Sequence, residues 1–109
     1  MKRGEIWTAS AGSGYAGKPR PVVIVQDDRF DATNSVTICA LTTDSTDAPL
    51  FRLPVAPSEE NGLRAASRLM VDKLTIVAKS TLGAQLGRLE EDDIVRLNRA
   101  MVVFLGLGG

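Results

Sequence analysis

Apolar residues along this chain recur mainly at every second position, which is the spacing of a half-buried β-strand. Short runs of this kind, rich in valine, isoleucine and leucine, alternate with segments of glycine, proline, aspartate and serine that are typical of turns. The predicted strands cover residues 2–9, 20–26, 36–43, 50–55, 67–72, 74–78 and 85–89. Two of them, at 22–25 and 36–41, have apolar residues on both faces, which indicates strands covered on both sides.

Residues 90–107 have a different spacing and are predicted to form the one clear helix. Their apolar residues recur at intervals of three and four and form a stripe, which consists of Ile94, Leu97, Met101, Phe104 and Leu105. Four consecutive acids at 90–93 lie in the first turn, where negative charge complements the helix dipole. Glycines from position 106 onward are expected to end the helix.

Closely spaced strands followed by a terminal helix predict a mainly β fold, a small and mostly antiparallel barrel capped by that helix. The sequence contains no repeat, low-complexity tract or linker, so residues 1–109 are expected to form a single domain. A chain of this length has a modest core, and strands that are apolar on both faces need more cover than one helix supplies. We therefore expect a homodimer.

The composition restricts the chemistry that the chain can perform. With 13 basic and 13 acidic residues the formal net charge is zero, which argues against a protein that simply coats a polyanion. The absence of histidine and the presence of one cysteine, Cys39, exclude an internal disulfide and leave no plausible zinc site. The sequence shows neither a signal peptide nor a membrane-spanning run, so we expect a cytoplasmic protein. Any hydrolytic chemistry must do without imidazole, and we expect it to need no metal.

Arg20 stands between Pro19 and Pro21 at the start of the strand predicted at 20–26. Because proline restricts φ to about −65°, the two prolines hold Arg20 extended where loop becomes strand. A rigid guanidinium at a strand end suits recognition of an anion, above all phosphate. When RNA is cleaved by its own 2′-hydroxyl, such a group would stabilise the additional negative charge. The alternative is a solvated loop arginine.

Thr42 and Thr43 end an apolar strand, which is a rigid position from which to present a hydroxyl group. They face opposite sides of the sheet, so one of them at most can join Arg20. The alternative is that both are there for their β propensity. Asp72 ends the strand predicted at 67–72, where it could accept a proton, pair with Arg20, read a base or simply face solvent.

Other residues allow chemical interpretations that we weigh against simpler ones. The aspartates at 27, 28 and 31 suggest magnesium, but their spacing is typical of Asx turns. Cys39 has apolar neighbours and is expected to be a core thiol. Tyr15, in the glycine- and serine-rich segment 10–18, is a candidate for stacking on a base. Trp7 could also stack, although a tryptophan in an N-terminal strand is more often part of a core or an interface.

Five segments, in their order along the chain, resemble the MazF/PemK-type toxins of type II toxin–antitoxin systems. The segments are RGEIW at 3–7, GKPRPVVIVQ at 17–26, CALTT at 39–43, the strand region 67–76 and LGRL at 86–89. Each segment is short, but together they cover essentially the whole chain. The resemblance implies an SH3-like β-barrel homodimer that cleaves single-stranded mRNA at short sequences without metal or cofactor. It also implies products with a 2′,3′-cyclic phosphate and a 5′-hydroxyl.

The resemblance also assigns roles by position. Arg20 matches the catalytic arginine of the family, and Thr42 matches the threonine that holds the reacting phosphate. Asp72 aligns with an aspartate that some members use, while Met70 stands where those members carry an arginine. We expect substrate contacts from Tyr15, Lys18, Thr43, Arg68 and Asp72. The implied partner is a MazE-like antitoxin whose C-terminal segment occupies the RNA groove.

Two rival functions come from other classes. Toxins of the CcdB type share this fold and bind a protein target such as DNA gyrase without cutting anything. The presence of both Arg20 and Thr42 favours the nuclease over this alternative. A small SH3-like adaptor would need a groove lined by aromatic residues, and the chain has five aromatics in all.

Overall fold

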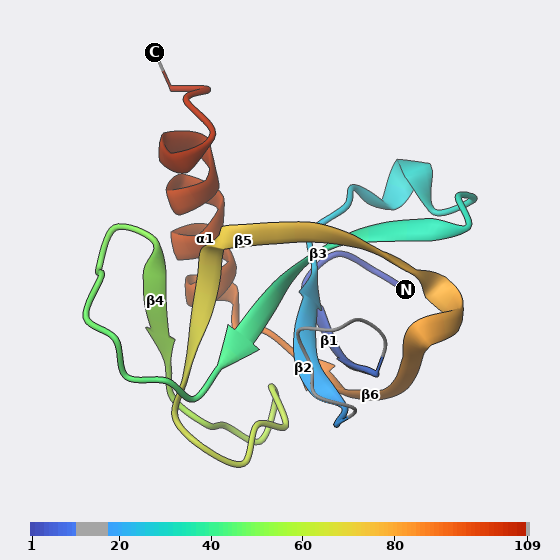
Figure 1. The fold of residues 1–109 in the computed structure, drawn as a ribbon, viewed down its shortest axis with the longest axis horizontal. Coiled ribbons are helices and arrows are strands. Elements are labelled where there is room, and N and C mark those ends of the chain that lie inside the picture. The colour runs from blue at the N-terminus through green and yellow to red at the C-terminus, as the bar shows by residue number, and fades with distance from the viewer. Residues whose placement is uncertain (11–17, 109) are drawn as a thin grey trace.

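The computed structural model describes residues 1–10 and 18–108. Within these residues, six strands form one sheet and a single α-helix follows the last strand (Figure 1). The elements are β1 (Glu5–Ala9), β2 (Arg20–Ile24), β3 (Ser35–Thr42), β4 (Arg52–Val55), β5 (Ser67–Ala78), β6 (Leu82–Arg88) and α1 (Glu91–Phe104), with short 3-10 helices η2 (Asp28–Phe30) and η3 (Lys79–Thr81). The order across the sheet is β4-β5-β3-β2-β1-β6, and every neighbouring pair is antiparallel. The predicted mainly β class with a C-terminal helix is confirmed.

The two strands predicted at 67–72 and 74–78 are one long strand, β5. Its pairing with β3 is interrupted, because Cys39 pairs with Leu74 whereas Leu41 pairs with Leu69. The additional β5 residues form a bulge, and a bulge bends its strand. Figure 1 shows β5 beginning beside β4 and then bending to run across the molecule. The break in alternation near residue 72 is therefore a bulge inside a strand and not a strand end.

The barrel is not closed by pairing between its edge strands β4 and β6 within the described residues. Instead, the turn that follows β4 packs against β6, where the Arg88 N–H donates a hydrogen bond of 2.9 Å to the Glu60 carbonyl. Gly62 has a φ of +68°, and a Cβ at this position would lie 2.0 Å from the Leu86 carbonyl oxygen. Only glycine combines this backbone conformation with so close an approach. The predicted Asn61-Gly62 turn is thus the element that bridges the open side of the barrel.

Alternation along the strands produces an apolar cluster on each face of the sheet. The first cluster lies under α1 and includes Ile6, Val23, Cys39, Leu41, Leu69, Val71, Leu97 and Ala100. The second lies on the opposite face and consists of Ala9, Val22, Ile24, Val36, Ile38 and Ala40, with Trp7, Met70, Val77 and Leu82 packed at its margin and only partly buried. The prediction of strands that are apolar on both faces is confirmed. The helix covers only the first cluster.

Helix α1 buries the middle of the predicted stripe and exposes its end. Leu97 and Ala100 are buried, whereas Phe104 and Leu105 remain exposed. The helix ends at Phe104, three residues earlier than predicted, because Gly106 adopts a φ of +73° and the Leu107 N–H turns back to the Val102 carbonyl. Among the described residues, no helix is both long and apolar enough to cross a membrane.

Candidate active site

Arg20, Thr42 and Arg68 lie in one row across three neighbouring strands. Arg20 is the first residue of β2, and Val22 of the same strand pairs with Ala40 of β3. Because the strands are antiparallel, the same register two residues away places Arg20 level with Thr42 at the end of β3. Thr42 in turn pairs directly with Arg68 of β5. Directly opposed residues of antiparallel strands face the same side of the sheet. We call these three residues the Arg20 row.

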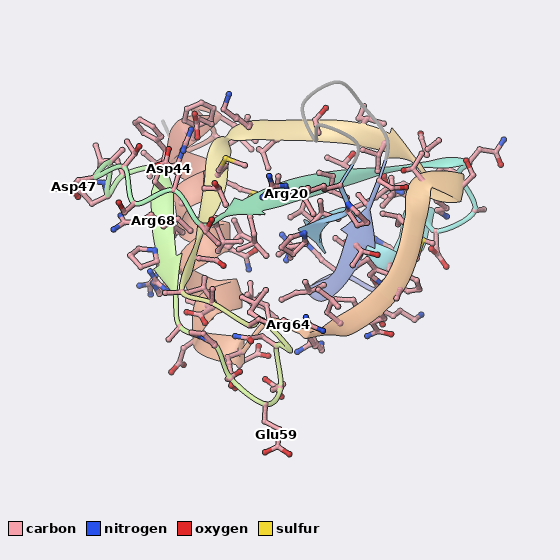
Figure 2. All side chains as sticks on the ribbon, turned by 60° about the horizontal axis from the view of Figure 1, so that its bottom comes forward. Arg20, Asp44, Asp47, Glu59, Arg64 and Arg68 are labelled. Atoms are coloured by element: carbon pink, nitrogen blue, oxygen red, sulfur yellow. The ribbon has the colours of Figure 1, made fainter. Side chains whose placement is uncertain are left out.

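The row lies on the face that the helix leaves open. Two residues further along the same strands, Val22 and Ala40 belong to the second apolar cluster, and Met70 packs against it. Because strands are spaced about 4.8 Å apart, the backbones of Arg20 and Arg68 are separated by roughly 10 Å, with Thr42 between them. Figure 2 shows Arg20 and Arg68 on this side of the molecule. The apolar cluster gives the row a rigid base.

The three side chains of the row differ in how firmly they are held. The Arg20 side chain is exposed and has no hydrogen-bond or ion-pair partner within residues 1–10 and 18–108, although its backbone pairs with Ala9 of β1. Thr42 is half-buried, and its Oγ1 accepts a 3.1 Å hydrogen bond from the Asp44 N–H. The acceptor role of this oxygen leaves the hydroxyl proton available to another acceptor. Arg68 is half-buried, so the row offers one oriented hydroxyl on the strand between those that carry the two arginines.

Asp72 is paired with Arg52, not with Arg20. The Arg52 Nε and Nη2 donate to the two carboxylate oxygens of Asp72 at 2.7 and 3.0 Å. These hydrogen bonds lower the pKa of Asp72, and the pair is mostly buried, with the two side chains 12% and 23% exposed. The sequence alone does not point to Arg52, whose place opposite Met70 on β4 puts it on the face that carries Asp72. The geometry favours a positioning role for this ion pair.

The other residues predicted to contact substrate differ in their exposure and surroundings. Lys18 is exposed two residues before Arg20, and Thr43 is exposed immediately after Thr42. Tyr15 lies outside the described residues. Trp7 is half-buried, packs against the second cluster and donates from Nε1 to Glu5 at 3.0 Å, which favours the core role over base stacking.

Cys39 and the aspartates at 27, 28 and 31 have structural surroundings. Cys39 is buried, and burial raises the pKa of its thiol to about 12, so the predicted core thiol is confirmed. Asp27 caps η2 by accepting from the Arg29 N–H at 2.8 Å, as expected of an Asx turn. Asp31 pairs with Lys79. No group of three or more histidine, cysteine, aspartate or glutamate side chains that could hold a metal ion occurs in the described ranges.

The protein family of this chain follows from a match to a family model that covers almost its whole length. The model of the PemK-like, MazF-like toxins of type II toxin–antitoxin systems matches residues 2–105. The chain belongs to this family. Membership of this MazF-like family agrees with the resemblance in the five segments and speaks against the CcdB-type and adaptor alternatives.

Two relatives extend over nearly the whole length of this MazF-like toxin. A protein of Mycolicibacterium smegmatis named "Probable endoribonuclease MazF" is 55% identical over 109 residues, which cover both chains completely. "Endoribonuclease MazF9" of Mycobacterium tuberculosis is 25% identical over 116 residues, with 98% of each chain covered.

Solved structures show the same fold. A mycobacterial endoribonuclease in complex with its cognate antitoxin has a TM-score of 0.81 at 24% identity, covering 98% of this chain and 96% of that one. A MazE–MazF structure from Deinococcus radiodurans has a TM-score of 0.76 at 16% identity, covering 97% and 96% of the two chains.

Proposed function

We propose that this MazF-like endoribonuclease toxin cleaves single-stranded mRNA at short sequences, without a metal ion, at the Arg20 row. The observation that carries the proposal is the alignment of Arg20, Thr42 and Arg68 on one open face of the sheet. Two arginines and a threonine on neighbouring strands supply hydrogen-bond donors that can stabilise a phosphate as it gains negative charge during the reaction. Both relatives are named as endoribonucleases, which supports internal cleavage of RNA as the reaction.

The proposed reaction is an internal transfer of the phosphoryl group. The 2′-oxygen of one nucleotide forms a bond to the adjacent phosphorus, and the bond from phosphorus to the 5′-oxygen of the next nucleotide breaks. The 2′-hydroxyl loses a proton and the departing 5′-oxygen gains one. The products are a 2′,3′-cyclic phosphate and a 5′-hydroxyl, so no water is consumed in this step.

The three side chains of the row contribute charge stabilisation. Arg20 and Arg68 donate to the non-bridging oxygens, whose negative charge increases as the fifth bond to phosphorus forms. The Thr42 hydroxyl donates to the same group from between them. A guanidinium remains protonated at neutral pH, so the arginines act as donors and not as bases. Lys18, Thr43 and Tyr15 are proposed to contact the RNA beyond the cleaved phosphate. Asp72 contributes indirectly, because its carboxylate holds the Arg52 side chain in place.

The proposal is tested by incubating the protein with a long single-stranded RNA in EDTA and analysing the ends of the fragments. We expect cleavage at a short recurring sequence, with 5′ ends that a kinase can label directly because they carry a hydroxyl. Strict dependence on added magnesium, or fragments with a 5′-phosphate, would show that the mechanism is wrong.

We also propose that the chain, as one domain of residues 1–109, acts in the cytoplasm as a homodimer that an antitoxin neutralises. The margin of the second apolar cluster, with Trp7, Met70 and Leu82 only partly buried, supports a second copy as its cover. The complexes of neighbouring structures with an antitoxin support the partner. An antitoxin segment that carries carboxylates to Arg20 should bind more weakly as salt increases. Light scattering at micromolar concentration tests the dimer, and an active monomer would contradict it.

A further inference from the structure

Arg64 is an exposed arginine on the segment that leads from the Asn61-Gly62 turn to β5. Within residues 1–10 and 18–108 its side chain has no hydrogen-bond or ion-pair partner. Other cations of these residues are paired with carboxylates, namely Arg29, Arg52, Lys79, Arg88 and Arg96. Arg64 is therefore available to an anion from outside the chain.

The backbone that carries Arg64 is anchored on both sides. Before it, the buried Asn61 accepts through Oδ1 from the Leu63 N–H at 3.0 Å, and Leu63 is itself buried in the first cluster. After it, the buried Ser67 donates from Oγ to the Ala65 carbonyl at 3.0 Å. Binding of an anion by Arg64 therefore requires ordering of one side chain and not of a loop.

This segment lies at the same end of the sheet as the Arg20 row. Figure 1 shows the start of β2, the end of β3, the start of β5 and the loop before β5 in the lower half of the molecule. Figure 2 brings this end forward and shows Arg20, Arg68 and Arg64 on it. Neither Arg20 nor Arg68 forms an ion pair within the described ranges. Three cations without a carboxylate partner are thus placed at one end of the sheet.

Exposed acids near this end lie apart from Arg64. Asp44 and Asp47 belong to the loop after β3, and both are exposed. Figure 2 shows Asp47 on the other side of Arg68 from Arg64, and Glu59 pointing away at the tip of its own loop. Because like charges repel, a polyanion that holds one phosphate at the row is favoured toward Arg64 and disfavoured over the acidic loop.

We propose that Arg64 binds a phosphate that flanks the cleaved one, so that the RNA strand leaves the Arg20 row toward segment 61–66 and away from the loop at 44–47. The inference rests on the proposed function and adds a binding residue to it. A contact to a phosphate carries no information about the base, so Arg64 contributes affinity and not the choice of sequence. Charge stabilisation of the reacting phosphate stays with the row.

The first test measures binding of a non-cleavable 2′-O-methyl RNA of mixed sequence at several salt concentrations. For single strands, each neutralised phosphate contributes about 0.7 to the slope of log K against log salt. We expect Arg64→Ala to bind about fivefold to tenfold more weakly at low salt, with a slope smaller by about 0.7. Arg64→Lys, which keeps the charge, should keep the slope. Arg99→Ala, which removes an exposed arginine of α1, should bind like wild type. An Arg64→Ala protein with wild-type affinity and slope would overturn the proposal, as would absence of binding by wild type.

The second test follows steady-state cleavage of RNA by the same variants and separates this inference from the proposed function. A contact outside the reacting bond supports binding equally before and during the reaction, so Arg64→Ala should raise KM by about fivefold to tenfold and leave kcat unchanged. The sequence at the fragment ends should also stay the same. A lower kcat at unchanged KM would place Arg64 in the reaction itself and overturn the proposal. Absence of cleavage by wild type, with the salt response of the first test present, would contradict only the nuclease.

Discussion

The two faces of the sheet differ in what covers them. The first cluster is sealed by α1, and its largest members, including Ile6, Leu69 and Leu97, are at most 2% exposed. Within residues 1–10 and 18–108 no helix lies over the second cluster, and the Arg20 row lies at its edge with Arg20 exposed. Burial of apolar surface stabilises the fold on the first face, while open charged groups are available for a ligand on the second. Stability and activity should therefore respond to mutations on opposite faces.

The largest effect on stability should come from the helix-covered face. Leu97→Ala removes a buried side chain and leaves a cavity, so we expect the free energy of unfolding in denaturant to decrease by about 2–5 kcal/mol. Cleavage per folded molecule should stay at the wild-type level. Val103→Ala, on the same helix but 68% exposed, is the control and should change stability by no more than about 0.5 kcal/mol. A loss of cleavage in fully folded Leu97→Ala would break the distinction between the faces.

A smaller effect, this time on activity, should come from the open face. Thr42→Val keeps the shape of the side chain and removes only the hydroxyl. Because a hydrogen bond to a charged group contributes about 1.5–3 kcal/mol, the cleavage rate should decrease by about tenfold to a hundredfold. The variant also loses the acceptor for the Asp44 N–H, so Thr42→Ser, which restores the oxygen, should recover much of the rate. Wild-type rates in Thr42→Val would remove this residue from the site.

The smallest effect concerns the Arg52–Asp72 pair and depends on pH. The pKa of Asp72 is lowered by hydrogen bonds from Arg52, so its contribution to stability is complete above the unfolded pKa near 3.9 and is lost as pH falls through the lower folded value. Asp72→Asn should cost about 1 kcal/mol at pH 7. Urea unfolding of both proteins from pH 7 to pH 2 should show this difference shrinking below about pH 4. A difference that stays constant over this range would mean that the charge of Asp72 contributes nothing.

Local patterns predicted most of the elements, and the failures share a physical cause. Alternation and apolar runs together placed all the strands, but the prediction divided β5 after Asp72 because a bulge interrupts alternation just as a strand end does. The helix was extended by three residues because Phe104 and Leu105 continue the apolar spacing, while the positive φ of Gly106 had already ended it. In both places the deciding information is backbone geometry that residue types express only weakly.

The site was only partly predictable for a different reason. Arg20 was identified by its flanking prolines, and Thr42 by its strand end together with the family resemblance. That Arg68 lies directly opposite Thr42, and that Arg52 pairs with Asp72, depends on register between strands distant in sequence. No local pattern encodes such pairings. The bridging role of the Asn61-Gly62 turn against β6 is of the same kind.

The most direct test of the central claim measures RNA cleavage and unfolding together for Arg20→Ala, with Arg29→Ala as the matched control. Arg29 is an exposed arginine in η2, beyond the opposite end of β2. We expect Arg20→Ala to lower the cleavage rate in EDTA by about 10²–10³ with an unchanged unfolding midpoint, since a preorganised donor is lost from an open face. Arg29→Ala should cut at the wild-type rate. A folded Arg20→Ala protein that cleaves RNA as fast as wild type would contradict the assignment of the Arg20 row as the active site.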